Sequence, residues 1–293
     1  MKYEVSHLTR YSYGAPVAVN VCVLRLLPRI GEGQRVFEAG VEVTPRPLER
    51  VERLDAFGNR ALRLRIETPH RELTIHSHAR VAVDRPPPPL PAITPAWEDV
   101  AALAAASASL DPDSPAAAIY PSRLAPLFAS ATDYARSSFP AGRPIYEGAA
   151  ELARRIKADF AYDSRATDAA TSPIEAFANK RGVCQDFAHV MIAALRGLGL
   201  PALYVSGYIR TIPPPGQPRL VGADASHAWA SVWCGPGFGW LGLDPTNAIA
   251  AGDDHIVVAI GRDYSDVPPV EGLIVSSGAH ALDVAVDVAP IGG

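Results

Sequence analysis

Four consecutive prolines, in the segment RPPPPLPAITP at residues 85–95, constrain the fold of this chain more than any other feature. Proline fixes one backbone angle and has no N–H group to donate, so such a run cannot continue a helix or a central strand. It favours an extended, stiff segment instead. We therefore expect a Pro-rich linker at residues 86–95, with one domain at residues 1–85 and a second at residues 96–293. A chain of 293 residues has room for both.

The first domain is rich in alternation between apolar and polar residues. In NRALRLRIE, for example, Leu62, Leu64 and Ile66 share one face, and the charged residues between them share the other. A period of two is typical of strands, and the segment DAFGN at residues 55–59 has the composition of a turn between two of them. We predict an N-terminal antiparallel β-sandwich-like domain.

The second domain begins with helical patterns and ends with strand patterns. Alanine-rich and amphipathic segments precede residue 200, and IYEGAAELARRIKADF places Ala149, Leu152, Ile156 and Phe160 at helical spacing. After residue 200 the segments ALYVSGYIR, HAWASVWC, GWLGLDP, HIVVAIG and ALDVAVDV read as strands. This segregation predicts an α+β fold in which helices pack on a mostly antiparallel sheet.

Cys184 is the first candidate functional residue. It follows Gly182 and opens a segment, CQDFAHVMIAALRG, whose apolar residues recur at helical spacing. A cysteine in the first turn of a helix lies near unpaired backbone N–H groups and the positive end of the helix dipole. Both favour a thiolate, and the same N–H groups can bind an oxyanion. The pattern also fits an unreactive buried cysteine, so a base is needed to distinguish the two.

His227 and Asp244 are the expected partners of the thiol. His227 opens the strand SHAWASVW, and Asp244 ends the strand GWLGLD. If the two face each other directly across an antiparallel hairpin, the turn is centred between Gly235 and Pro236, where turn residues stand. Their Cβ atoms would lie about 5 Å apart. Asp244 would then accept the Nδ1–H of His227 and leave Nε2 for the thiol.

Two alternatives remain open on the residues alone. Asp224 and His227, three positions apart in GADASH, could belong to a metal site, but the sequence offers no recognisable third ligand. A non-catalytic scaffold is the other alternative, because an ordered triad does not by itself prove turnover.

Three segments together carry a resemblance to a known family. RGVCQDFAHVMIAALRGLGLPALYVSGY, SHAWASVW and GWLGLDPTN resemble the bacterial branch of the transglutaminase-like superfamily over residues 140–250. HLTRYSYGAPV and DAFGNRAL resemble the β-rich N-terminal region attached to these proteins. The resemblance implies a papain-like core with Cys184 as nucleophile, His227 as general base and acid, and Asp244 as the orienting carboxylate. It also implies an enzyme, either a cysteine protease or amidase or a transglutaminase-like acyltransferase.

Five further residues are candidates for contacts with substrate or oxyanion, each with a structural alternative. Gln185 stands where eukaryotic transglutaminases have a tryptophan, which argues against protein cross-linking. We favour hydrolysis of a peptide or related amide over transfer to an amine, because a cytosolic setting supplies water and the sequence shows no recognisable site for an acceptor amine. Asp186 fits either a helix-capping role or the substrate cleft. Tyr162 could line the site, Ser226 could polarise the histidine, and Trp229 could wall the cleft; packing or loop roles fit these three as well.

Composition limits the remaining classes. A net charge of −4 gives no general attraction to nucleic acid or to an anionic membrane surface. Three cysteines are too few for a disulfide framework, and the N-terminus lacks a signal-peptide pattern, so we expect a cytoplasmic protein. We expect a peptide, protein or small amide substrate and no cofactor, since no acidic cluster resembles a calcium loop. The N-terminal domain is free to bind substrate, to cover the site or to mediate a homo-oligomer.

Overall fold

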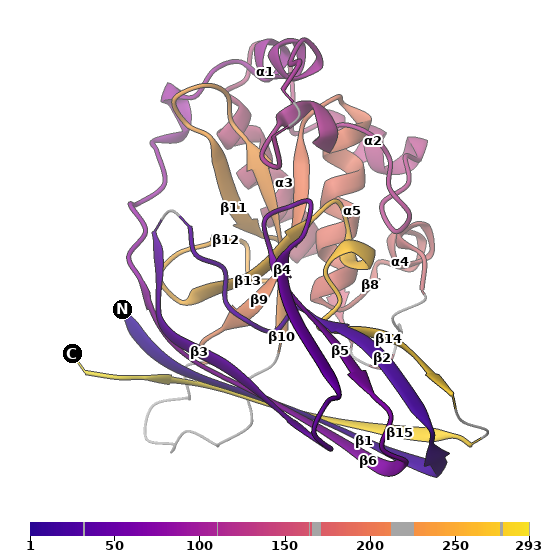
Figure 1. Cartoon of the computed structure of the whole chain (residues 1–293). Helices are drawn as coiled ribbons and strands as arrows, with labels where there is room; N and C mark the ends of the chain where they lie inside the picture. Colours follow the sequence, from indigo (N-terminus) through magenta and orange to yellow (C-terminus); the bar gives the residue numbers. More distant parts are fainter. Residues whose placement is uncertain are drawn as a thin grey trace, which may run out of the picture.

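The structure, a computed structural model, describes residues 1–31, 33–109, 111–163, 165, 171–211, 226–275 and 278–292. Two four-stranded antiparallel sheets form the β-sandwich, drawn in the lower part of Figure 1. The first sheet joins, in spatial order, β15 (His280–Pro290), β1 (Lys2–Val17), β6 (His70–Val83) and β3 (Gln34–Thr44). The second joins β14 (Val270–Val275), β2 (Val19–Leu24), β5 (Arg60–Ile66) and β4 (Glu49–Leu54).

A third, five-stranded antiparallel sheet and five α-helices form the remainder of the described chain. The sheet joins, in order, β12 (Ile249–Ala250), β11 (Trp240–Asp244), β10 (Ser226–Trp233), β9 (Ala202–Ile209) and β13 (His255–Gly261). The helices are α1 (Trp97–Ala105), α2 (Ala129–Arg136), α3 (Ile145–Asp159), α4 (Pro173–Asn179) and α5 (Cys184–Gly197). A short parallel pair, β7 (Ala161–Tyr162) and β8 (Arg181–Gly182), leads into α5.

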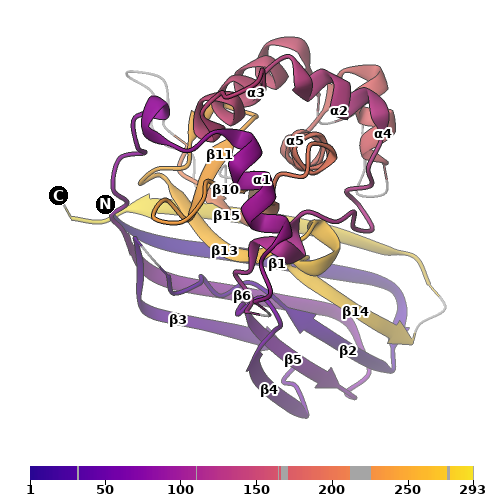
Figure 2. The same cartoon turned by 90° about the horizontal axis from the view of Figure 1, so that it is seen from above.

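The central helix α5 is buried because apolar residues occupy most of its circumference. Viewed from above, it lies at the middle of the other four helices (Figure 2), and its side chains Phe187, Met191 and Leu195 are at most 1% exposed. Its inner face packs on β9 and β10. The predicted stripe of α3 is buried in the same core, including Leu152 and Ile156. In the described part of the chain, no helix is both long and apolar enough to cross a lipid bilayer.

One face of the long strands β1 and β6 contributes side chains to two hydrophobic cores. Alternate residues point inward, and at one end of β6 Leu73 and Ile75 contribute to the sandwich core. At the other end, Val81 and Val83 pack with Tyr208 of the five-stranded sheet. The sandwich is therefore joined to the five-stranded sheet by an apolar contact surface, and not by the linker alone.

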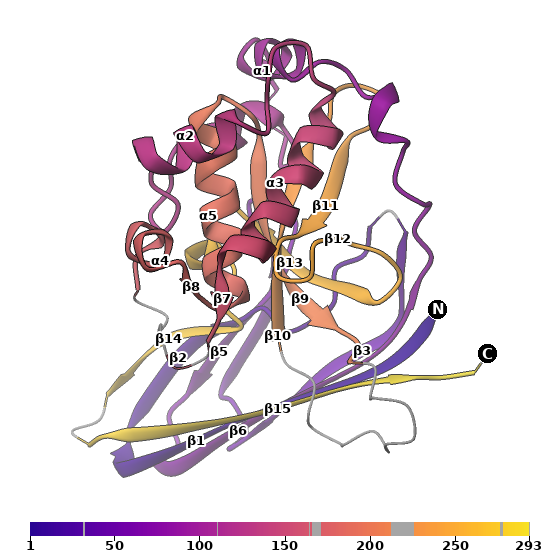
Figure 3. The same ribbon diagram turned by 180° about the vertical axis from the view of Figure 1, so that it is seen from behind.

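The predicted fold class is confirmed, but the predicted domain boundary is wrong at its C-terminal end. β15 pairs with β1 from Tyr3↔Pro290 to Tyr13↔His280, and β14 pairs with β2. The two ends of the chain consequently lie side by side (Figure 3). Strands β14 and β15 thus complete the sandwich instead of extending the core that begins at residue 96. Their alternating pattern fits any antiparallel sheet, so the sequence alone did not reveal which sheet they join.

Candidate active site

Cys184 is the first residue of α5, as predicted, and its position is fixed from both sides. Asp186 Oδ2 accepts the N–H of Val183 at 2.8 Å, which caps the start of the helix. Gly182 permits this contact, since a Cβ there would lie 2.5 Å from the same oxygen. Before it, Lys180 has a positive φ of 51°, and its Nζ lies 3.7 Å from the centre of the Phe177 ring. The approach to Cys184 is therefore held by contacts that leave the thiol itself half-buried.

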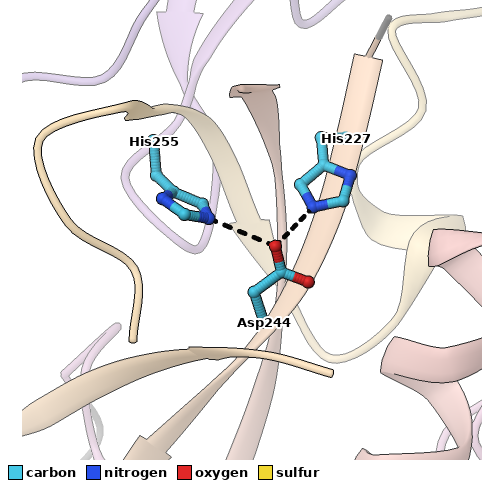
Figure 4. A group of neighbouring side chains, drawn as sticks. All are labelled: His227, Asp244 and His255. Atoms are coloured by element: carbon cyan, nitrogen blue, oxygen red, sulfur yellow. Dashed lines mark hydrogen bonds and ion pairs between the residues drawn. The ribbon is translucent and has the colours of Figure 1, made fainter. Parts of the chain in front are cut away.

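His227 and Asp244 meet, but not in the predicted register. The last strand pair before the turn is Trp233↔Trp240, and Ala230 pairs with Leu243. This register places Asp244 opposite residue 229 and diagonal to His227, two residues from the direct pairing that we predicted. The side chains still share a face, and His227 Nε2 lies 2.8 Å from Asp244 Oδ2 (Figure 4).

The orientation of the imidazole also differs from the prediction. Nε2, not Nδ1, is the nitrogen that donates to Asp244, so Nδ1 is the nitrogen available to Cys184. Burial alone disfavours the charged ring. However, the hydrogen bond with Asp244 and the interaction with Cys184 outweigh burial and raise the pKa of His227 from 6.5 to about 9. The ring is thus held between the carboxylate and the thiol in a form that favours the imidazolium.

Asp244 is fully buried, and both of its oxygens have hydrogen-bond donors. Oδ1 accepts the backbone N–H groups of Thr246 at 2.8 Å and Asn247 at 3.2 Å. Oδ2 accepts the Asn247 side-chain amide at 2.7 Å in addition to His227. Burial raises the pKa of this carboxyl group, but the hydrogen bonds and the charge of His227 prevail and lower it well below its usual value. Asp244 is therefore ionised and rotationally fixed.

His255 is a further member of the group that sequence reasoning missed. This histidine is 1% exposed, and its Nε2 lies 3.3 Å from Asp244 Oδ2 (Figure 4). No local sequence signal marks this role, because only the folded course of the connection 245–254 brings His255 back to Asp244. One potential metal-ligand atom from each of the two histidines and Asp244 lies within 4.8 Å of the other two. Each histidine is hydrogen-bonded to Asp244, so the three residues form a hydrogen-bonded group centred on this carboxylate.

The five further candidate site residues fall into two groups, three that are accessible to solvent and two that are buried. Tyr162 is 56% exposed beside the thiol, and its pKa is raised by partial burial and by the charge of Cys184. Gln185 is half-buried next to the nucleophile. Ser226 is exposed at the start of β10. These three residues are therefore accessible to solvent, in whole or in part.

Asp186 and Trp229 have interior positions. Asp186 is 2% exposed in the first turn of α5, where it provides the cap described above. Trp229 is 2% exposed, and its ring lies edge-on to His255 with centroids 5.1 Å apart, so it packs beneath the imidazoles and does not wall an open cleft. Asp224, considered as a metal ligand, lies outside the described residues. His189 is buried, and its Nε2 accepts the N–H of Tyr264 at 3.1 Å.

Comparisons with known proteins identify relatives of the whole chain. Residues 3–82 match the bacterial transglutaminase-like N-terminal region, and residues 133–245 match the transglutaminase-like superfamily. An uncharacterized protein of Mycobacterium tuberculosis is 43% identical over 100% of this chain and 94% of its own length. One of Mycobacterium leprae is 33% identical over 98% of each chain.

A solved structure shares the fold along the whole chain. The crystal structure of a "putative cysteine protease" from Cytophaga hutchinsonii superposes with a TM-score of 0.73 at 19% identity and covers 100% of this chain and 92% of its own. A protein-glutamine gamma-glutamyltransferase of Pseudomonas aeruginosa is 39% identical over 75 residues, which are 25% of this chain and 11% of that protein. From the two family matches and the full-length relatives, the chain belongs to the transglutaminase-like superfamily.

Proposed function

We propose that this protein is a thiol-dependent acyl-transfer enzyme in which Cys184 is the nucleophile, His227 the general base and acid, and Asp244 the orienting carboxylate. The observation that carries the proposal is the position of the His227 ring. Its Nε2 is hydrogen-bonded to a buried carboxylate, and the ring interacts with a thiol at a helix N-terminus. A nucleophile, a base and a group that orients the base are the requirements of this chemistry.

The reaction follows from these positions. The Cys184 thiolate attacks an amide carbonyl carbon, and the carbonyl oxygen becomes an oxyanion near the first N–H groups of α5. His227 donates its Nδ1 proton to the leaving nitrogen as the C–N bond breaks, and an acyl-enzyme remains. A water or amine then gives a proton to His227 Nδ1 and attacks the thioester, which releases Cys184. Asp244 remains ionised and stabilises the imidazolium whenever it forms.

Hydrolysis of a peptide or related amide is the reaction that we favour. Gln185 follows the nucleophile in this chain, in place of the tryptophan of eukaryotic cross-linking enzymes. The relation to a protein named as a cysteine protease is one of fold along the whole chain, whereas the similarity to a named glutamyltransferase covers a quarter of it. Both similarities support acyl transfer. The experiment below distinguishes water from an amine as the acceptor of the acyl group.

Trapping of the acyl-enzyme tests the proposal. Purified protein is incubated with a library of peptides and small amides, quenched with acid, and analysed by mass spectrometry of the tryptic peptide that carries Cys184. We expect an acyl adduct on this residue in the wild type and none in Cys184→Ala. Addition of a primary amine separates the two outcomes, because hydrolysis yields a free acid and transfer yields an amide.

The non-catalytic alternative makes the opposite prediction. A binding scaffold retains the substrate reversibly, so it forms no covalent adduct at any time point and binds the same peptides with equal affinity in Cys184→Ala. That result would remove the enzyme proposal.

A further inference from the structure

The mechanism above leaves a buried histidine unused. His255 is the first residue of β13, and its Nδ1 lies 3.3 Å from the backbone nitrogen of Gly252. A ring nitrogen that accepts a hydrogen bond from a backbone N–H group carries no proton. The remaining proton of the neutral ring is therefore on Nε2, which points at Asp244 Oδ2 at 3.3 Å (Figure 4). In this tautomer His255 is a donor to the orienting carboxylate.

This donor shares one oxygen with His227. Asp244 Oδ2 accepts His227 at 2.8 Å and His255 at 3.3 Å. Each additional donor draws negative charge from the oxygen and weakens it as an acceptor for the others. His255 thereby limits rotation of the carboxylate and moderates its attraction for the His227 proton, which the base must release in each cycle.

The β-sandwich holds the turn from which His255 projects. Arg85 follows the last sandwich strand before the linker, and its Nη1 donates to the carbonyl oxygens of His255 at 2.5 Å and Gly252 at 2.7 Å. Its backbone N–H donates to Asp253 Oδ1 at 3.0 Å. One side chain of the sandwich region thus fixes both ends of the short turn that sets the position of the imidazole.

Two buried amides of the sandwich extend this attachment along β13. The Gln34 side chain donates to the carbonyl oxygen of Val257 and accepts its N–H, both at 2.8 Å. Asn59 does the same with Ile260, again at 2.8 Å in both directions. These are the contacts that a neighbouring strand would provide to an edge strand. Both amides are buried, at 2% and 0% exposure, so β13 has no solvent-facing edge at these positions.

We propose that His255 is a positioning residue of the active site, which orients Asp244 toward His227. The β-sandwich sets its position through Arg85 and the two amides, so the N-terminal domain is part of the catalytic arrangement. The inference rests on the proposed acyl-transfer function for its catalytic consequence. The placement of His255 itself can be tested without any substrate.

The first test is an NMR titration of the protein labelled with ¹⁵N-histidine. In the wild type we expect His255 to be protonated at Nε2 and unprotonated at Nδ1; the opposite tautomer would overturn the proposal. The groups that face the His227 ring from neighbouring elements are Cys184 on α5, Asp244 on β11 and His255 on β13. Trp229, on its own strand, is not titratable.

Substitution then measures the effect of the donor on His227. In His255→Phe we expect the pKa of His227 to rise by about half to one pH unit. The reason is that Asp244 Oδ2 loses the hydrogen bond from His255 and then accepts more strongly from His227. His255→Gln, which retains an N–H donor, should restore the wild-type value. His70→Phe is the matched control, since His70 is a half-satisfied buried histidine of the sandwich with no contact to Asp244. If His255→Phe folds and the pKa of His227 is unchanged, the proposal is contradicted. If His255→Phe does not fold, the NMR measurement of the His255 tautomer in the wild type still tests the proposal.

A double-mutant cycle tests the connection to the sandwich. We expect His255→Phe to lower kcat by about tenfold, the size of one hydrogen bond to a charged group, with little change in KM. Arg85→Met should produce part of this loss in the wild type and almost none in the His255→Phe background. If the losses of kcat in the two single variants instead multiply in the double variant, Arg85 acts independently of His255 and this connection is contradicted. A wild type that forms no acyl-enzyme removes the proposed function, while the NMR experiment still decides the placement of His255.

Discussion

The two sides of the candidate active site differ in how completely their polar groups are engaged. On the acid–base side, His227, Asp244 and His255 are 9%, 0% and 1% exposed and are joined by hydrogen bonds. On the nucleophile side, Cys184 is half-buried and Tyr162 is 56% exposed. The buried polar groups are therefore held by their protein partners, whereas Cys184 and Tyr162, which the proposed mechanism places at the substrate, are partly or largely accessible to solvent.

This difference implies that substitutions on the two sides act on different quantities. Changes on the buried side alter proton transfer and stability, because each group there depends on its neighbours. Changes on the open side alter contacts with substrate and leave the fold intact. The predictions below test this separation.

Asp244→Asn should have the largest effect on activity. The amide can place an N–H group against His227 Nε2, which forces the ring proton to Nδ1 and removes the base from the thiol. We expect kcat to fall by about 10³–10⁴-fold, with the far-ultraviolet circular dichroism unchanged. Asn179→Leu, at an exposed position of α4, is the control and should retain activity. Near-normal turnover in Asp244→Asn would remove this residue from the triad.

Stability should fall on the alkaline side because of His227. Its pKa is raised from 6.5 to about 9 in the folded protein, so its contribution is complete below pH 6.5 and is lost as the pH rises through 9. We expect the free energy of unfolding of the wild type to decrease over this range by on the order of 1–3 kcal/mol more than that of His227→Gln. Urea titrations at pH 6, 8 and 9.5 measure this difference, and parallel curves for the two proteins would contradict the assignment.

Loss of an amide at the sandwich edge should reduce stability by a similar amount. Asn59→Leu leaves the N–H and carbonyl groups of Ile260 without their partner at a partly buried position. We expect a decrease of about 2–4 kcal/mol in the free energy of unfolding, measured by urea titration. Asn179→Leu, at an exposed position of α4, is the matched control and should differ little from wild type. Equal stability of the two variants would mean that the edge contact contributes nothing.

Tyr162→Ala should have the smallest effect, and it should fall on KM. The exposed ring can contact substrate beside the nucleophile, so its removal should raise KM by about two- to tenfold and leave kcat nearly unchanged. Steady-state kinetics separate the two constants. A large fall in kcat with constant KM would place Tyr162 on the catalytic side instead.

Much of this arrangement could be predicted from local sequence signals. Cys184 at the start of a helix, His227 at the start of a strand and Asp244 at the end of one follow from periodicity and turn residues. The register could not, because the turn is wider than a tight hairpin. Gly235, Gly237 and Gly239 all have positive φ, and Cys234 donates its N–H to the carbonyl of Gly239. Compared with the predicted hairpin, the centre of the turn lies one residue further along the chain, and the residue opposite Asp244 therefore differs by two positions.

The contributions of distant segments were also beyond local signals. His255 looked like an ordinary strand residue, since nothing nearby in the sequence shows that the connection 245–254 returns it to Asp244. Gln34 and Asn59 are polar residues in a β-rich region, and their role depends on the edge of a strand some 200 positions later in the chain. Such contacts are set by tertiary packing and leave no periodic trace.

The central claim is that Cys184 and His227 act as one unit, and the alkylation rate of Cys184 tests it most directly. Iodoacetamide reacts with the thiolate, which a protonated His227 stabilises. At pH 6 we expect alkylation of Cys184, followed by mass spectrometry, to be at least about tenfold slower in His227→Ala than in the wild type. Identical rates in the two proteins across pH 5 to 9 would contradict the claim.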